Sequence, residues 1–122
     1  MSEEARRVLI VDDDSLILRA LQRVLEAQGF TVTGCSNPEE ALARLEAEPA
    51  NLVVSDYMMP GMNGVEVLSH VRRIRPDAPR LLLTAVNDFK VAAEAVNTGE
   101  VYRLLTKPWN HAELITTIRQ AY

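Results

Sequence analysis

The stretch VLIVDDDS at residues 8–15 contains four aliphatic residues followed by three aspartates and a serine. A second stretch, LVVSD at residues 52–56, repeats the arrangement of a short apolar run that ends in an acid. Runs that are apolar on both faces are typical of parallel strands, because helices cover both sides of such a sheet. The two stretches therefore predict two buried parallel strands, each with a carboxylate at its carboxyl end.

Outward from these two strands, three further runs of strand-like composition occur at residues 31–35, 80–83 and 101–105. Each of the five runs is followed by a segment with helical spacing of apolar residues. Right-handed crossovers place such helices on both faces of one sheet. We therefore predict an α/β fold, namely a (βα)₅ doubly wound, flavodoxin-like, five-stranded parallel sheet with strand order 2-1-3-4-5.

Capping residues and helix-ending residues mark the boundaries of the predicted helices. Residues able to cap a helix N-terminus precede four of the helical patterns. These residues are Ser15, Asn37, Asp88 and Asn110. Gly29, Pro76 and Gly99 follow the first, third and fourth patterns, and glycine and proline commonly end helices. The sequence therefore predicts separate helices, one of them between Asp88 and Gly99.

Length and composition indicate one domain. The chain has 122 residues, 48% of them hydrophobic, and a net charge of −4, so we expect a single domain at 1–122 with no nucleic-acid-binding surface. Cys35 is the one cysteine, which excludes an internal disulfide and fits a cytoplasmic location. No apolar run approaches the roughly 20 residues of a membrane-spanning helix. Because the sequence stops within a helical pattern, we expect a fragment of a longer protein.

Acidic residues gather at the predicted carboxyl ends of the first and third strands, the edge at which open parallel sheets bind ligands. Asp12, Asp13 and Asp14 follow the first strand, and Asp56 ends the third. Two like charges about 4 Å apart repel by about 4 kcal/mol at an effective dielectric near 20. An oxygen-rich cluster without histidine or cysteine suits Mg²⁺, so the sequence predicts a magnesium site. We expect Asp14 to be a solvated residue or to stand at the entry of the helix, rather than to bind the metal.

A hydroxyl and an ammonium group follow the fourth and fifth strands. Thr84 and Lys107 stand at these strand ends, so both side chains are expected to face the acidic cluster. With Mg²⁺ they would supply a cation bridge, a hydrogen-bond donor and a fixed positive charge, which a transferring phosphoryl group needs. Asp56 would be the nucleophile.

Four segments carry a resemblance to a known family. They are Val11-Asp12-Asp13, the stretch from Ser55 to Gly64, Leu83-Thr84-Ala85 and Thr106-Lys107-Pro108. In this order and at these strand ends, they resemble the signatures of receiver domains of two-component response regulators. The resemblance covers essentially the whole chain.

The resemblance implies a role for each acidic residue. Asp56 would accept a phosphoryl group from a sensor histidine kinase or a phosphotransfer protein. Asp13 and Asp56 would bind Mg²⁺ directly and Asp12 through water, while Met58 would contribute its backbone carbonyl. The chain would then be a signalling switch rather than an enzyme, although it would assist its own phosphorylation and dephosphorylation.

The resemblance also assigns the other strand ends. Thr84 would bind a phosphoryl oxygen, Ala85 would leave room for the phosphoryl group, and Lys107 would pair with it. The peptide between Lys107 and Pro108 would be cis, which is accessible at low cost only before proline. The protein would control a C-terminal output domain or another effector, and it would form a homodimer on phosphorylation.

One position departs from the family pattern. Many receivers carry Tyr or Phe three residues before the lysine, where the ring moves inward on activation, and here that position is Leu104. The Lys-Pro-Trp sequence that ends at Trp109 is similar to a subset of receivers, some with cyclic-di-GMP phosphodiesterase outputs and some with transcriptional outputs. Trp109 itself fits either a hydrophobic anchor or a partner surface.

Two other functions are compatible with the fold. A receiver-like interaction module that works without phosphorylation usually lacks an acid or the lysine, and this sequence retains all of them. A Mg²⁺-dependent phosphohydrolase generally has a second acid two residues after the nucleophile. That position is Met58, which cannot transfer protons.

Overall fold

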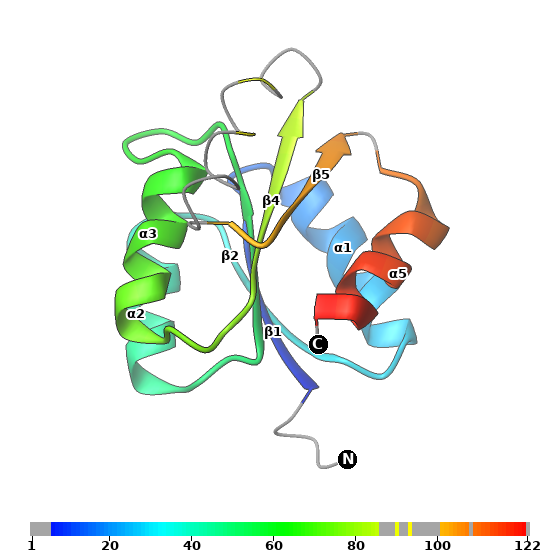
Figure 1. Ribbon diagram of the computed structural model, residues 1–122, viewed down its shortest axis with the longest axis horizontal. Coiled ribbons are helices and arrows are strands. Elements are labelled where there is room, and N and C mark those ends of the chain that lie inside the picture. Colours follow the sequence, from blue (N-terminus) through cyan, green and yellow to red (C-terminus); the bar gives the residue numbers. More distant parts are fainter. Residues whose placement is uncertain (1–5, 86–89, 91–92, 94–100, 108, 122) are drawn as a thin grey trace.

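The computed structural model describes residues 6–85, 90, 93, 101–107 and 109–121. Its five strands are β1 Arg7–Val11, β2 Thr31–Cys35, β3 Leu52–Asp56, β4 Arg80–Ala85 and β5 Arg103–Lys107. They form one parallel sheet in the order β2-β1-β3-β4-β5 (Figure 1). The predicted fold class and strand order are confirmed.

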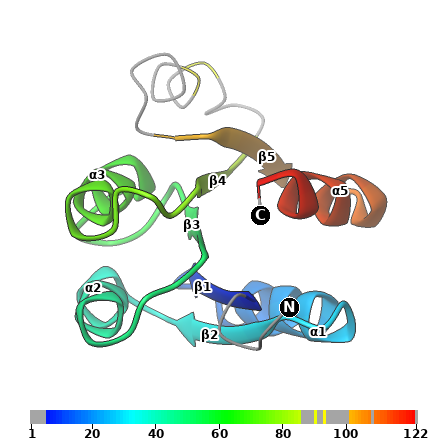
Figure 2. The ribbon, with the colours of Figure 1, turned by 60° about the horizontal axis from the view of Figure 1, so that its bottom comes forward.

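The described helices are α1 Ser15–Ala27, α2 Pro38–Ala47, α3 Gly64–Ile74 and α5 His111–Ala121. Figure 2 shows α1 and α5 on one face of the sheet and α2 and α3 on the other. The helix predicted between Asp88 and Gly99 falls outside the described residues, apart from Lys90 and Ala93. Within the part of the chain that the structure describes, no helix has the length and apolar character to cross a membrane.

Alternate residues of each strand supply two separate hydrophobic clusters. Leu9 and Val11 of β1 face the α2 and α3 side together with Val53 and Leu82. Val8 and Ile10 belong to the cluster on the α1 and α5 side. Trp109 also packs against this second cluster, which supports its interpretation as an anchor. Burial on both faces explains why the strands are recognisable as continuous apolar runs.

Of the predicted helix caps, Asn37 at α2 and Asn110 before α5 are confirmed, Ser15 at α1 is wrong, and Asp88 lies outside the described residues. Asn37 caps α2 and accepts a hydrogen bond from the backbone N–H of Glu40. Ser15 was expected to cap α1, but the cap is Asp14, whose carboxylate accepts the N–H of Leu16 at 2.9 Å. Asp14 has the extended backbone of an N-cap, whereas Ser15 is already helical. Asp14 is therefore an exposed residue at the entry of the helix, as expected.

The fifth strand is displaced along the chain from its predicted position. It was expected at residues 101–105 and runs from Arg103 to Lys107, where Thr106 pairs with Thr84 and Lys107 with Ala85. Val101 is buried but precedes the strand. An apolar run marks burial rather than strand pairing, so the prediction included Val101 and missed the two polar residues that end the strand.

Candidate functional site

The site lies where β1, β3, β4 and β5 reach their carboxyl ends. Asp12 follows β1, Asp56 ends β3, Thr84 is the penultimate residue of β4 and Lys107 ends β5. Asp12 and Thr84 are fully buried, and Asp56 is 5% exposed. Parallel pairing of β1 with β3, β3 with β4 and β4 with β5 brings these side chains to one edge of the sheet.

Lys107 links two of the aspartates. Its Nζ lies 2.7 Å from Oδ1 of Asp56 and 3.2 Å from Oδ2 of Asp12. The other oxygen of Asp12 accepts the backbone N–H of Asp14 at 2.9 Å. Both oxygens of Asp12 are therefore engaged, which leaves this carboxylate less available to a metal ion than its neighbours.

Three carboxylates converge closely enough to hold a metal ion. Asp12, Asp13 and Asp56 each place a carboxylate oxygen within 4.8 Å of the others. Asp13 is exposed, and among the described residues its carboxylate takes part in no hydrogen bond. The geometry thus brings together the predicted acidic ligands, and it leaves Asp13 and one oxygen of Asp56 the freest among them. Such a donor set of oxygens fits Mg²⁺.

The electrostatics of the site favour bound cations and protons. Burial, together with the charges of Asp12 and Asp13, raises the pKa of Asp56, although its hydrogen bond with Lys107 acts in the opposite direction. Burial lowers the pKa of Lys107, but the hydrogen bond to Asp56 and the charges of both aspartates outweigh it, so this pKa is raised. The pKa of Asp56 is thus raised chiefly by burial, and the pKa of Lys107 by its two carboxylate partners. With three carboxylates and one ammonium group at the site, the excess of negative charge favours a cation.

The other predicted residues lie around this cluster. The Thr84 hydroxyl donates a hydrogen bond to the carbonyl oxygen of Ala85 at 3.2 Å, so it is not directed at Asp56 by a hydrogen bond. Ala85 is partly exposed, and the Met58 residue is 63% exposed. Pro108, and with it the predicted cis peptide, lies outside the described residues.

Two features of the site were not anticipated from the sequence. The Ser55 hydroxyl donates a hydrogen bond to the backbone carbonyl of Asp56 at 3.0 Å. At the end of β2, the carbonyl of Cys35 accepts the backbone N–H of Asp12 at 3.1 Å. Its thiol is buried, and burial followed by the charge of Glu40 raises its pKa to about 11, which disfavours a reactive thiolate.

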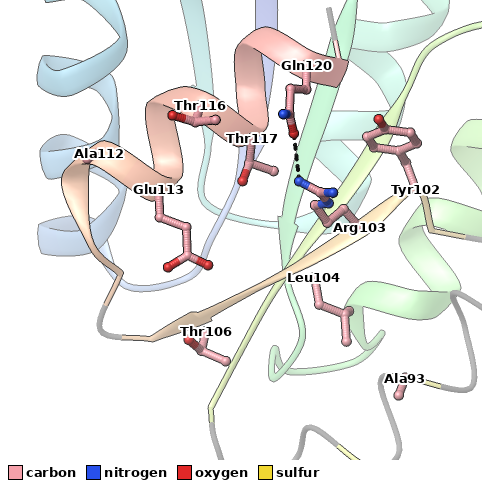
Figure 3. Close-up of a pocket in the computed structure, with 10 residues that line it drawn as sticks. All are labelled: Ala93, Tyr102, Arg103, Leu104, Thr106, Ala112, Glu113, Thr116, Thr117 and Gln120. Atoms are coloured by element: carbon pink, nitrogen blue, oxygen red, sulfur yellow. Dashed lines mark hydrogen bonds between the residues drawn. The ribbon is translucent and has the colours of Figure 1, made fainter.

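A separate cavity of about 840 Å³ lies between β5 and α5 (Figure 3). Leu104 and Thr106 line it from β5, while Glu113 and Thr117 line it from α5. None of the acidic residues of the site borders this cavity. Leu104 also packs against the cluster on the α2 and α3 side, so it belongs partly to the core.

The family model for the response regulator receiver domain matches residues 8–119. The chain belongs to this family. Among curated relatives, it is 37% identical over 117 residues to the C4-dicarboxylate transport transcriptional regulatory protein DctD of Rhizobium meliloti, covering 96% of this chain and 25% of that protein. This receiver domain therefore spans about a quarter of that relative's length.

Two solved structures extend the comparison. One is described as adenylate cyclase from Rhodopirellula baltica, with 39% identity, a TM-score of 0.90, and coverage of 95% of this receiver domain and 86% of that chain. The other is the receiver domain of an HD domain-containing protein from Pseudomonas fluorescens Pf-5, with 36% identity and a TM-score of 0.87. It covers 94% of this receiver domain and 85% of that chain. The two names indicate different functions, so these structures leave the output of this receiver domain open.

Proposed function

We propose that this receiver domain is a switch that accepts a phosphoryl group on Asp56 from a sensor histidine kinase or a phosphotransfer protein. The observation that carries the proposal is the 2.7 Å hydrogen bond from Lys107 to one oxygen of Asp56, beside two further carboxylates. A buried aspartate in contact with a cation is the arrangement that an aspartyl nucleophile and its charged product both need.

The transfer forms a bond between the free carboxylate oxygen of Asp56 and phosphorus, and it breaks the bond between phosphorus and the donor histidine nitrogen. Lys107 holds the other oxygen of Asp56 and stays beside the growing negative charge. Asp13, Asp56 and the Met58 carbonyl would hold Mg²⁺, with Asp12 acting through water, and the metal would neutralise charge on the phosphoryl oxygens. Thr84 donates to a phosphoryl oxygen once its hydroxyl leaves the Ala85 carbonyl, and the small Ala85 leaves space.

The proposed setting is a longer regulator in the cytoplasm. Residues 1–122 would form one domain that controls an output domain, in keeping with the much greater length of DctD. The partners would be the kinase, the output domain or effector, and a second copy of the phosphorylated protein. The single buried cysteine is compatible with a reducing compartment.

Incubation with acetyl phosphate and Mg²⁺, followed by intact-mass measurement, tests the proposal. We expect one added phosphoryl group that is lost slowly on standing, and none without Mg²⁺. Asp56→Asn removes the nucleophile and should stay unlabelled. Asp13→Asn should keep its fold but lose most Mg²⁺ binding and labelling.

A wild-type protein that remains unlabelled would instead favour an interaction module that works without phosphorylation. Label on another residue in Asp56→Asn, or an unchanged Mg²⁺ affinity in Asp13→Asn, would contradict the assignments of Asp56 and Asp13 respectively.

A further inference from the structure

The loop that follows Asp56 is closed by the first residue of α3. Gly64 is buried, and its backbone N–H donates to the carbonyl oxygen of Tyr57 at 2.8 Å. Asn63 and Glu66 form a capping box that fixes the start of the same helix. The segment that contains Met58 is therefore held at both of its ends.

Gly64 approaches the backbone of Asp56 more closely than any other residue type could. A Cβ atom at Gly64 would overlap the carbonyl oxygen of Asp56 and would lie 2.9 Å from its carbonyl carbon. It would also lie 2.6 Å from a methyl group of Leu82, which is a flexible side chain that can move. Relief of the backbone overlap requires α3 or the end of β3 to shift.

The carbonyl group of Asp56 is held from a second direction. Ser55 donates its hydroxyl to the same oxygen at 3.0 Å, and the next peptide N–H, that of Tyr57, donates to Leu83 in β4 at 2.9 Å. Few directions are left in which this peptide can move without loss of a hydrogen bond. A displacement forced by a side chain at residue 64 would therefore be passed to the Asp56 side chain.

We propose that Gly64 is a positioning residue for phosphoryl transfer, because it allows α3 to press against the Asp56 peptide and so fixes both the Asp56 carboxylate and the Met58 carbonyl. The proposal rests on the function proposed above. A misplacement of about 1 Å in reacting groups can cost about 100-fold in rate. Gly64 touches neither phosphate nor metal, so its effect is on geometry alone.

Gly61 provides a matched control in the same loop. It has a positive φ of 85°, and an added Cβ would have no atom within 4 Å. Alanine at residue 61 therefore strains its own backbone without pushing on a neighbour. Gly61→Ala should lower the melting temperature yet keep the Mg²⁺ affinity and labelling rate within about twofold of wild type.

The experiment compares Gly64→Ala with Gly61→Ala in Mg²⁺ titrations and in labelling by acetyl phosphate at saturating Mg²⁺. We expect Gly64→Ala to weaken Mg²⁺ binding and to slow labelling by at least tenfold even when all molecules hold metal, because Asp56 itself is displaced. A second substitution, Leu82→Ala, should not restore the rate, because it relieves only the side-chain contact.

Three outcomes would overturn the proposal: a wild-type rate in folded Gly64→Ala, full rescue by Leu82→Ala, or an equal loss in Gly61→Ala. If Gly64→Ala does not fold, Ser55→Ala tests the proposal instead. This substitution removes the hydrogen bond to the Asp56 carbonyl and adds no atom that overlaps it. Labelling slowed several-fold would support the positioning of this peptide, and a wild-type rate would overturn it. If the wild-type protein takes no label, the proposed function fails, while the Mg²⁺ titrations still test Gly64.

Discussion

At the residue scale, Lys107 determines how the acidic site is held together. Its ammonium group is shared between Asp12 and Asp56. The sequence predicted that Lys107 would face the acids, because parallel strands end at one edge. It could not predict the sharing, which depends on the reach of one side chain and on the burial of two others. The Ser55 hydrogen bond was missed for the same reason, since a serine before an aspartate has no distinctive pattern.

The raised pKa of Asp56 has a consequence for stability in the absence of metal. The native state binds the Asp56 proton more tightly than the unfolded state, whose pKa lies near the ordinary 3.8. The free energy of unfolding therefore falls as pH rises from that ordinary value through the raised one. Asp56→Asn removes the ionisable group and with it this loss of unfolding free energy, while Lys107 keeps its ion pair with Asp12.

We expect metal-free Asp56→Asn to melt a few degrees above wild type at neutral pH, where about 1 kcal/mol corresponds to roughly 4 °C. The difference should shrink as pH falls toward 4, because wild-type Asp56 then becomes neutral as well. Thermal unfolding, monitored by circular dichroism in the presence of a chelator, measures this difference in melting temperature. Asp77→Asn, an exposed aspartate in the α3–β4 connection, serves as the control. A difference that persists unchanged at low pH would contradict the role of Asp56 ionisation.

At the scale of elements, residue types predicted the positions of the helices more accurately than the residues at which the helices begin. The stretch before α1 offers both Asp14 and Ser15, and either side chain can cap a helix. The backbone decides between them, because Asp14 is also tied by its own N–H to Asp12. The displacement of β5 has a comparable origin, since strand pairing extends through Thr106 and Lys107 whether or not these residues are apolar.

The cap assignment predicts different costs for two adjacent substitutions. Asp14→Ala removes the acceptor of the Leu16 N–H and should lower the free energy of unfolding by about 1 kcal/mol. Ser15→Ala should change it by less than about 0.5 kcal/mol, because Ser15 is in the first helical turn and alanine favours helix. Urea denaturation in a chelator compares the two. A larger loss in Ser15→Ala would mean that Ser15 is the cap after all.

At the scale of the whole molecule, the alternation of apolar runs and helical patterns was sufficient to predict the fold class and the edge that carries the acids. Right-handed crossovers limit the possible topologies, and the order 2-1-3-4-5 was predicted as one of the common doubly wound arrangements. Close approaches between elements could not be predicted in the same way. The contact of Gly64 with Asp56 depends on how α3 packs on β3, and a glycine beside an asparagine is equally typical of an ordinary turn.

In the proposed switch, the signal would pass from the acidic edge toward the cavity between β5 and α5. Thr84 pairs with Thr106 across β4 and β5, and Leu82 pairs with Leu104. Since alternate residues of a strand share a face, Thr84 and Leu104 are on the same face of the sheet, one pair apart. Movement of the Thr84 hydroxyl toward a phosphoryl oxygen would vacate space near Leu104, which lines the cavity in Figure 3.

This arrangement predicts opposite effects for Thr84→Ala and Leu104→Ala. Leu104 is already half-buried against the core and has no polar group that holds it at the surface, so it should follow the change rather than drive it. Leu104→Ala should lower the free energy of unfolding by about 2 kcal/mol and leave the phosphorylation-dependent change intact. Thr84→Ala should cost at most about 1 kcal/mol and abolish most of that change. Hydrogen exchange of residues 86–97 and of β5, measured with and without acetyl phosphate, reports the change. The relay is wrong if Leu104→Ala is labelled and folded but shows no change in exchange while Thr84→Ala still responds.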